Sequence, residues 1–253
     1  MKQRRPNILW LLSDQHNARA TGAASDGYVE TPHLDELASR GTTFTNAFCQ
    51  GPLCMPSRAS LLTQRYVADH GVIDNTIDGP ADPAPTVIQR IHDAGYHTAA
   101  LGKMHFFRYP ADMADTRERM HALGFDEALE MHGKYGNAHG HSAYTDYLAE
   151  RDQLPAYRQF LTALNPMTRP NTAAETGRPA HWSAEPAPLA DENHPDAWLA
   201  RQAAQWLADY AEPAPFFLIV GFAGPHDPWD APQTYVDRYA DRQVPLPASL
   251  ALP

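Results

Sequence analysis

The sequence predicts an α/β fold in which a central, mainly parallel sheet is flanked by helices. Three apolar runs carry this prediction: Pro6–Ser13, Tyr96–Leu101 and Phe216–Phe222. Each run is short and nearly continuous, as in strands buried on both faces, and segments with helical spacing lie between them. Each run also leads into a polar cluster. Because open parallel sheets bind ligands at the carboxyl ends of their strands, we expect one functional site along that edge.

The helix signals lie between these runs. The expected helices are Thr31–Gly41, Pro85–Gly95 and Asp196–Tyr210. The first two open on residues suited to helix starts and end at a glycine, and the third has a clear apolar face. We expect Thr42–Phe48 to form a further strand that leads into the segment around Cys54.

The pattern is poor from Tyr109 to about Pro195, where prolines, glycines and histidines cluster, as in His132–His141. We interpret this part as an irregular insertion. It either shapes a pocket or is a plain surface excursion.

Composition excludes several classes of protein. The chain has 253 residues, of which 43% are hydrophobic and 20% are charged, with a formal net charge of −10. These values are typical of a globular protein, and the absence of a basic run makes nucleic acid an unexpected partner. The apolar run Ile8–Leu12 is too short for a signal peptide, and no stretch is long enough to span a membrane. The sequence gives no indication of oligomeric state.

The chain contains two cysteines, Cys49 and Cys54. Without a disulfide framework, they fit a reducing compartment, and we expect a cytoplasmic protein. We expect Cys49 to be a buried structural residue. Cys54 differs, because Pro56 suits the first position of a helix and would place Cys54 just before its N-terminus, where an anion is favoured. Arg58 adds a fixed positive charge one turn on.

Polar residues follow each predicted strand. Asp14 and Gln15 offer oxygen ligands to a hard divalent cation. Lys103 and His105 share one face of an extended segment, because their spacing is two residues. His226 lies between prolines after the last strand, so its backbone is restrained.

The run C-x-P-S-R followed by A-S-L-L-T at Cys54–Thr63 resembles the sulfatase signature, in which an enzyme oxidises the cysteine to formylglycine. The family usually continues with Gly-Arg, and here Gln64-Arg65 follows. Other family motifs occur in the family's order from Pro6 to Trp229: D-Q at Asp14, H-G-V-x-x-N from His70 to Asn75, G-K-x-H at Lys103 and His105, and P-H-D-P at His226. The resemblance implies the alkaline-phosphatase-like fold.

The resemblance also implies a site. Cys54, as formylglycine, hydrates to a diol, and one hydroxyl attacks sulfur while bound to a divalent metal ion. Asp14, Gln15 and formylglycine 54 are the implied metal ligands. Calcium is the expected ion, with manganese or magnesium as alternatives.

Further roles follow from the same resemblance. His226 would assist the leaving oxygen, and His105 would accept a proton from the second hydroxyl. Lys103 would bind a sulfate oxygen, and Arg58 would neutralise charge around the diol. Asn75 is a candidate contact to the sulfate group. Lys103 and His226 would thus both bind substrate and act in catalysis.

The expected function is hydrolysis of a small-molecule or carbohydrate sulfate ester, after modification by a formylglycine-generating enzyme. The G-K-M-H-F and D-Q motifs are similar to the branch that contains choline sulfatase. Phosphonate monoester hydrolases share D-Q but lack the lysine and histidine of G-K-x-H, so a phosphonate monoester or phosphodiester hydrolase is the alternative. A non-catalytic binding protein that retains the fold is a third possibility.

The family supplies a second pair of metal ligands and a further lysine from a later segment, and no such segment occurs in residues 1–253. We therefore expect these residues to be the N-terminal part of one sulfatase catalytic domain, whose C-terminal part is absent.

Overall fold

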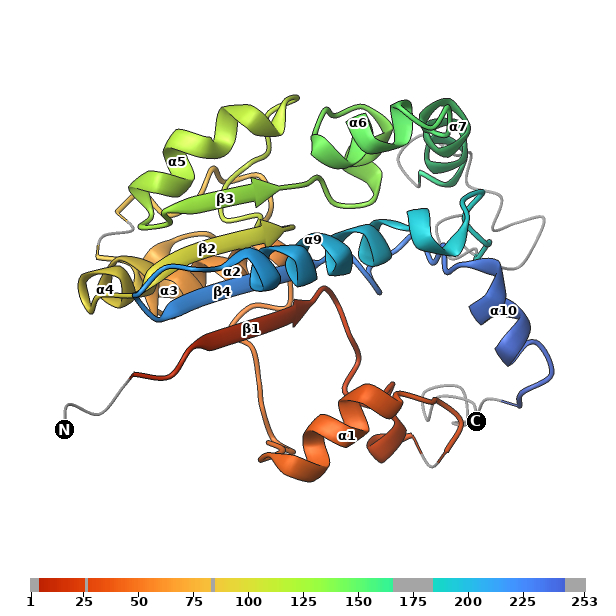
Figure 1. The fold of residues 1–253 in the computed structure, drawn as a ribbon, viewed down its shortest axis with the longest axis horizontal. Coiled ribbons are helices and arrows are strands. Elements are labelled where there is room, and N and C mark those ends of the chain that lie inside the picture. The colour runs from red at the N-terminus through yellow and green to blue at the C-terminus, as the bar shows by residue number, and fades with distance from the viewer. Residues whose placement is uncertain (1–4, 26, 83–84, 166–183, 244–253) are drawn as a thin grey trace.

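The computed structural model describes residues 5–25, 27–82, 85–165 and 184–243. Four parallel strands form one sheet in the order β1-β4-β2-β3 (Figure 1). The strands are β1 (Ile8–Ser13), β2 (His97–Gly102), β3 (Glu127–Glu130) and β4 (Phe216–Phe222). The predicted parallel α/β fold is confirmed.

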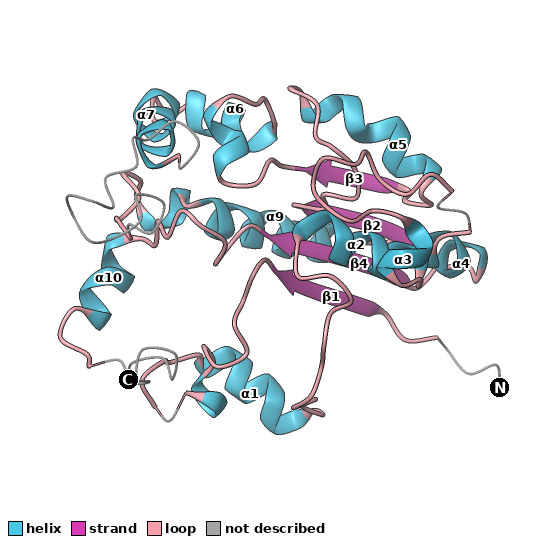
Figure 2. Ribbon diagram, turned by 180° about the vertical axis from the view of Figure 1, so that it is seen from behind, coloured by secondary structure: helices cyan, strands magenta, loops and turns pink. Residues whose placement is uncertain are grey.

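Helices cover both faces of the sheet. The helix α9 (Pro195–Asp209) lies on one face, and α2 (Cys54–Thr63), α3 (Val67–His70) and α4 (Val87–Asp93) lie on the other (Figures 1 and 2). The other helices in the described ranges are α1 (Pro32–Arg40), α5 (Arg117–Ala122), α6 (Ala143–Ala149), α7 (Leu154–Leu164) and α10 (Gln233–Tyr239). The described 3-10 turns are η1 (Gly22–Ala24), η2 (Met113–Thr116), η3 (Tyr135–Ala138) and η5 (Asp191–Asn193).

Alternate residues of the central strands enter two apolar cores. Leu218 and Val220 of β4 pack in the core beneath α9, whereas Phe217 and Ile219 pack in the core on the opposite face. This alternation follows from the two-residue period of a strand, and it explains why the strand reads as a continuous apolar run. No helix in the described part of the chain is both long and apolar enough to cross a bilayer.

The three helices predicted by range are confirmed closely as α1, α4 and α9, and a fourth helix, α2, begins earlier than expected. Thr86 caps α4 through a reciprocal capping box with Gln89. The helix α2 begins at Cys54, with Leu53 as its N-cap, and not at Pro56. Pro56 is tolerated in the first turn because the N–H that it lacks would have no partner inside the helix there.

The segment Thr42–Phe48 is not a strand but an irregular connection with turns. Phe44 and Phe48 are 79% and 84% exposed, and Cys49 is also exposed, so the prediction that Cys49 is buried is wrong. Strand propensity is expressed through packing against neighbouring strands, and no described strand pairs with this segment.

The prediction of an irregular insertion from Tyr109 to Pro195 is also wrong for much of its length. Its described part contains β3, α5, α6, α7 and three 3-10 turns, while residues 166–183 lie outside the described residues. Strand β3 has only four residues, so its apolar pattern is too short to be distinctive.

Glu130 at the end of β3 predicts a pH-dependent stability. Its side chain is 5% exposed, neither carboxylate oxygen has a hydrogen-bond partner among the described residues, and burial raises its pKa to about 7. A raised folded-state pKa means that ionisation is easier in the unfolded chain. Stability should therefore fall as pH rises from the ordinary glutamate pKa through 7, by about 3 kcal/mol in total.

We expect Glu130→Gln to raise the free energy of unfolding by up to about 3 kcal/mol at about pH 8 and to change it little at about pH 4. Urea denaturation at the two pH values measures both differences. An equal difference at both values would contradict an ionisation effect and would indicate a change in packing.

Candidate active site

Strands β1, β2 and β4 and helix α2 deliver side chains to one edge of the sheet. Asp14 follows β1, Lys103 follows β2, and His226 lies four residues beyond the end of β4. Cys54 enters from the first turn of α2. The backbone fixes the first two positions, because the Asp14 amide donates to the Gly224 carbonyl at 3.0 Å and the Lys103 amide donates to the Gly221 carbonyl at 2.7 Å. The predicted convergence of strand ends is confirmed.

Gly102 allows β2 to end at this edge. Its φ of +96° is in the left-handed region, and a Cβ atom there would overlap the Gly221 carbonyl and the Leu199 side chain. Glycine therefore permits both the turn and the close approach that aims Lys103 into the site.

Asp14 is the one carboxylate in a buried cluster with two cations. Lys103 Nζ contacts Asp14 Oδ2, and Arg58 NH1 lies 3.4 Å from Asp14 Oδ1. All three side chains are at least nine-tenths buried. Burial favours the neutral acid, but Lys103 and Arg58 outweigh it and hold the pKa of Asp14 below its ordinary value.

Cys54 lies beside this cluster. Its Sγ is 3.8 Å from both Asp14 Oδ1 and Lys103 Nζ. Burial would raise the thiol pKa, but a hydrogen bond with His226 and the charges of Lys103 and Arg58 bring the pKa below its ordinary value. The surroundings therefore stabilise negative charge on the atom attached to Cβ of residue 54, whether that atom is sulfur or a diol oxygen that takes its place.

The pKa values of the two histidines of the site, His105 and His226, are shifted in opposite directions. Burial lowers the pKa of His226, but hydrogen bonds with Asp227 and Cys54 raise it to about 10. Burial, followed by Lys103 and Arg58, lowers the pKa of His105 to about 3. Near neutral pH, His226 is thus protonated and His105 is neutral.

A cavity of about 430 Å³ opens beside Cys54. Lys103, His105, His226 and Asn75 line it, together with His132–Gly136 and His139–Gly140. Residues from the predicted insertion therefore do shape the pocket. His132, Lys134 and Tyr135 were missed as site residues, because sequence separates them from every recognised motif.

Two predicted residues have distinctive positions. Asn75 Oδ1 accepts a hydrogen bond from the Met55 amide at 2.9 Å, so Asn75 also fixes the first turn of α2. Gln15 is exposed and has a φ of 61°. Its role as a metal ligand stays a prediction.

The site offers part of a metal-binding set. Ligand atoms of Asp14, Cys54 and His226 lie within 4.8 Å of one another. A hard cation such as calcium takes six to eight oxygen ligands. Asp14 and a diol at residue 54 would supply oxygen ligands to one side of such an ion, but they are too few to surround it.

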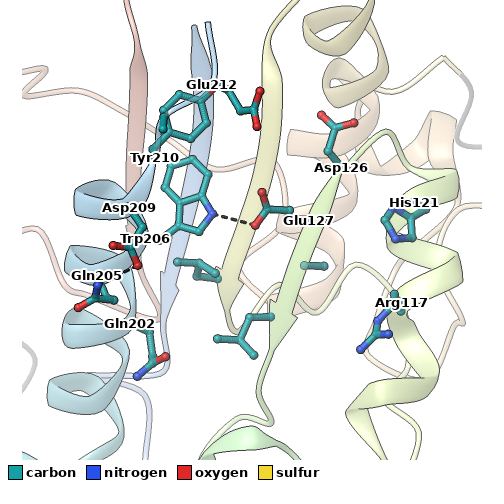
Figure 3. Close-up of a pocket in the computed structure, with 14 residues that line it drawn as sticks. Arg117, His121, Asp126, Glu127, Gln202, Gln205, Trp206, Asp209, Tyr210 and Glu212 are labelled. Carbon is teal, nitrogen blue, oxygen red and sulfur yellow. Dashed lines mark hydrogen bonds between the residues drawn. The ribbon is translucent and has the colours of Figure 1, made fainter. Parts of the chain in front are cut away.

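A larger hollow of about 610 Å³ lies elsewhere, over β2 and β3 between α9 and α5 (Figure 3). Trp206 Nε1 donates to Glu127 Oε2 at 3.0 Å within it. Its lining shares no residue with the Cys54 cavity among the described residues. Size therefore does not distinguish the two hollows, but the buried charged groups and Cys54 make the smaller one the candidate active site.

The parallel sheet with helices on both faces has the alkaline-phosphatase-like fold of solved sulfatases and phosphonate hydrolases. A match to the family described as Sulfatase spans residues 6–250, and the chain belongs to the sulfatase family.

Three comparisons illustrate this membership. The chain is 29% identical over 245 residues to an arylsulfatase of Clostridium perfringens, covering 96% of the chain and 48% of that relative. It is 29% identical over 253 residues to the choline-sulfatase of Rhizobium meliloti, covering 98% of this chain and 44% of that relative. The solved structure of the phosphonate monoester hydrolase SpPMH from Silicibacter pomeroyi has a TM-score of 0.67 and 26% identity, covering 96% of this chain and 46% of that one. The chain thus spans less than half the length of these relatives.

Proposed function

We propose that this chain carries the nucleophile and proton-transfer groups of a sulfatase, which hydrolyses a sulfate ester to an alcohol and inorganic sulfate. One observation carries the proposal. Residue 54 starts α2 among Asp14, Lys103, Arg58 and His226, in surroundings that stabilise an anion at its side chain. A sulfate ester brings an anionic group to such a site, and its hydrolysis develops further negative charge on oxygen.

The proposed reaction begins after a formylglycine-generating enzyme has oxidised Cys54. The aldehyde hydrates to a diol. One hydroxyl loses its proton to water, and its oxygen attacks sulfur as the bond between sulfur and the ester oxygen breaks. His226 donates a proton to that oxygen, and Lys103 binds a sulfate oxygen. Arg58, whose buried Nε and Nη2 atoms have no hydrogen-bond partner among the described residues, is available to neutralise the diol or the sulfate.

The second half of the reaction restores the enzyme. His105 takes the proton of the remaining hydroxyl, the carbon–oxygen bond to sulfate breaks, and the aldehyde forms again. A divalent ion held by Asp14, Gln15 and the diol would lower the pKa of the attacking hydroxyl. Calcium is the proposed ion, with manganese or magnesium as alternatives.

We further propose that residues 1–253 are the N-terminal part of one catalytic domain. Strand β1 is at an edge of the sheet, and its Leu9 and Leu11 side chains are 44% and 52% exposed. Helix α1 lies beyond β1 and has no buried residue (Figure 1). Further strands and ligands supplied by additional polypeptide would cover this apolar edge and complete the metal site.

Hydrogen exchange tests the domain proposal. Amides on the free edge of β1 should exchange rapidly in residues 1–253 alone and slowly in a longer polypeptide that hydrolyses sulfate esters. Equal exchange in both would contradict it.

The substrate proposal is a small-molecule or carbohydrate sulfate ester. Relatives include an N-acetylglucosamine-6-O-sulfatase of Bacteroides thetaiotaomicron as well as the arylsulfatase and choline-sulfatase. Two unpaired cysteines support the proposal of a reducing, cytoplasmic location.

Hydrolysis of phosphonate monoesters or phosphodiesters is the second candidate, supported by the likeness to SpPMH. The test compares kcat/KM of the full-length, formylglycine-containing enzyme on 4-nitrophenyl sulfate and on 4-nitrophenyl phenylphosphonate. Faster sulfate turnover supports the sulfatase proposal, and faster phosphonate turnover supports the alternative. Absence of turnover on both, with an aldehyde present at residue 54, would contradict both.

A further inference from the structure

The segment that carries His226 is held by two consecutive residues from outside any recognised motif. Tyr135 Oη donates to Asp227 Oδ2 at 2.9 Å. Lys134 Nζ donates to the Pro228 carbonyl at 3.1 Å and to Asp230 Oδ1 at 2.5 Å. Lys134 and Tyr135 therefore contact three of the four residues that follow His226.

The lysine contact is a deeply buried anchor. Lys134 is 5% exposed and Asp230 is fully buried. Tyr157 Oη also donates to Asp230 Oδ2 at 3.4 Å, and His194 Nε2 lies 3.7 Å from Asp230 Oδ1. A buried charge pair with additional hydrogen bonds is costly to break, so it fixes the Pro228–Asp230 end of the segment.

The turn that presents Lys134 and Tyr135 is itself braced. Arg158 of α7 donates to the Asn137 carbonyl at 3.3 Å and to the Gly140 carbonyl at 2.7 Å. Residues in and next to η3 thus contact α7 on one side and the segment after His226 on the other. The contacts with Arg158 fix the turn, and so they fix the position of Tyr135 beside Asp227.

Asp227, which Tyr135 holds, contacts the imidazole of His226 directly. His226 Nδ1 lies 3.0 Å from Asp227 Oδ1 and 2.7 Å from the Asp227 carbonyl oxygen. With Nδ1 turned to Asp227, Nε2 is the ring nitrogen left for residue 54, and ligand atoms of His226 and Cys54 lie within 4.8 Å of each other. A chain of contacts therefore runs from Tyr135 through Asp227 and His226 to the reactive residue.

We propose that Tyr135 and Lys134 are positioning residues that hold His226 in line with the leaving oxygen. The expected effect on the reaction rate rests on the proposed sulfatase function. The expected effect on the position of the His226 ring rests on the contacts alone. Tyr135 restrains the ring through Asp227, and Lys134 restrains the backbone beyond it. Loss of either restraint lets the imidazole adopt orientations from which proton delivery is inefficient.

Leaving-group dependence provides the kinetic test. A well-aligned acid matters most when the departing oxygen is strongly basic, so Tyr135→Phe should lower kcat/KM about tenfold for sulfates of weakly acidic phenols and little for 4-nitrophenyl sulfate. The plot of log kcat/KM against leaving-group pKa should become steeper. Asp227→Asn should steepen it in the same direction.

Tyr147→Phe is the matched control. It also removes a tyrosine hydroxyl that hydrogen bonds, in this case to Asn193 Oδ1 at 2.5 Å, but Asn193 belongs to η5 and not to the segment around His226. Its plot should keep the slope of the unsubstituted enzyme. A uniform loss across the series in Tyr135→Phe, or no loss, would overturn the positioning role.

A second readout needs no turnover. In ¹⁵N-histidine-labelled protein, the His226 ring signals should shift or broaden in Tyr135→Phe and stay unchanged in Tyr147→Phe. Unchanged His226 signals in Tyr135→Phe would overturn the proposal whatever the activity. A perturbed His226 in a protein whose unsubstituted form hydrolyses no sulfate ester would instead support the contact chain and contradict the proposed function.

Discussion

Cys54→Ala should lower kcat/KM of the full-length enzyme on an aryl sulfate by at least about 10⁴-fold, the order of loss seen when a covalent nucleophile is removed. Alanine carries no oxygen that can attack sulfur. The surrounding Lys103, Arg58 and His226 would still bind the sulfate group, so the loss should be mainly in kcat. Steady-state kinetics after expression with a formylglycine-generating enzyme measures both parameters.

Two further variants make this result specific. Cys49→Ala removes the other cysteine, which is exposed, and should leave kcat/KM unchanged. Cys54→Ser restores one hydroxyl but not the diol, so a sulfated serine could not expel sulfate by reforming an aldehyde. It should release at most one equivalent of alcohol and then stop. Sustained turnover by Cys54→Ala would show that residue 54 is not the nucleophile.

The presence of formylglycine can be tested without activity. A hydrazide reagent should label the tryptic peptide that contains residue 54 only when the generating enzyme is co-expressed. Cys54→Ala should not be labelled under the same conditions.

The central fold was predictable because its strands and its site obey strong local rules. The runs that became β2 and β4 are apolar and buried, whereas the apolar run that became β1 lies at the edge of the sheet and is largely exposed, and each run leads to a polar residue at the same sheet edge. Asp14 and Lys103 are therefore predictable as neighbours, because the ends of parallel strands meet at one edge of the sheet. Cys54 belongs to α2, and only its local motif predicts it as a site residue.

The remaining features depend on contacts between distant parts of the chain. Thr42–Phe48 has strand-forming residues but no described neighbouring strand, and β3 has four residues but is held in place by its pairing with β2. Tyr135 became a candidate only when the structure placed it 2.9 Å from Asp227, which is 92 residues away in sequence. No local pattern encodes such a contact.

The local charge of the site also differs from that of the whole chain. The formal net charge is −10, yet at the sheet edge three cations, Lys103, Arg58 and His226, meet only the carboxylates of Asp14 and Asp227. An anionic ester would meet a positive local field in a protein that is acidic overall. The burial of these groups makes Asp14 important for folding as well as for chemistry.

Asp14→Asn should therefore destabilise the metal-free protein by about 4 kcal/mol. The substitution keeps the size of the side chain but leaves Lys103 and Arg58 buried without the carboxylate that lies between them. Urea denaturation in the presence of a chelator, with Cys54 unmodified, gives the free energy of unfolding. Asp78→Asn is the matched control, because its ion pair with Arg119 at 3.1 Å is solvent-exposed and should contribute less than about 1 kcal/mol.

A double-mutant cycle separates the charge effect from a change in packing. In the Asp14→Asn background, Lys103→Met removes one of the two uncompensated cations and should recover part of the lost stability, whereas Lys103→Met alone should not stabilise the protein to the same extent. Additive effects of the two substitutions would mean that the buried contact has no net coupling energy. The cluster would then be maintained for its chemistry alone, and the stability of the sheet edge would come from the apolar cores on either side of it.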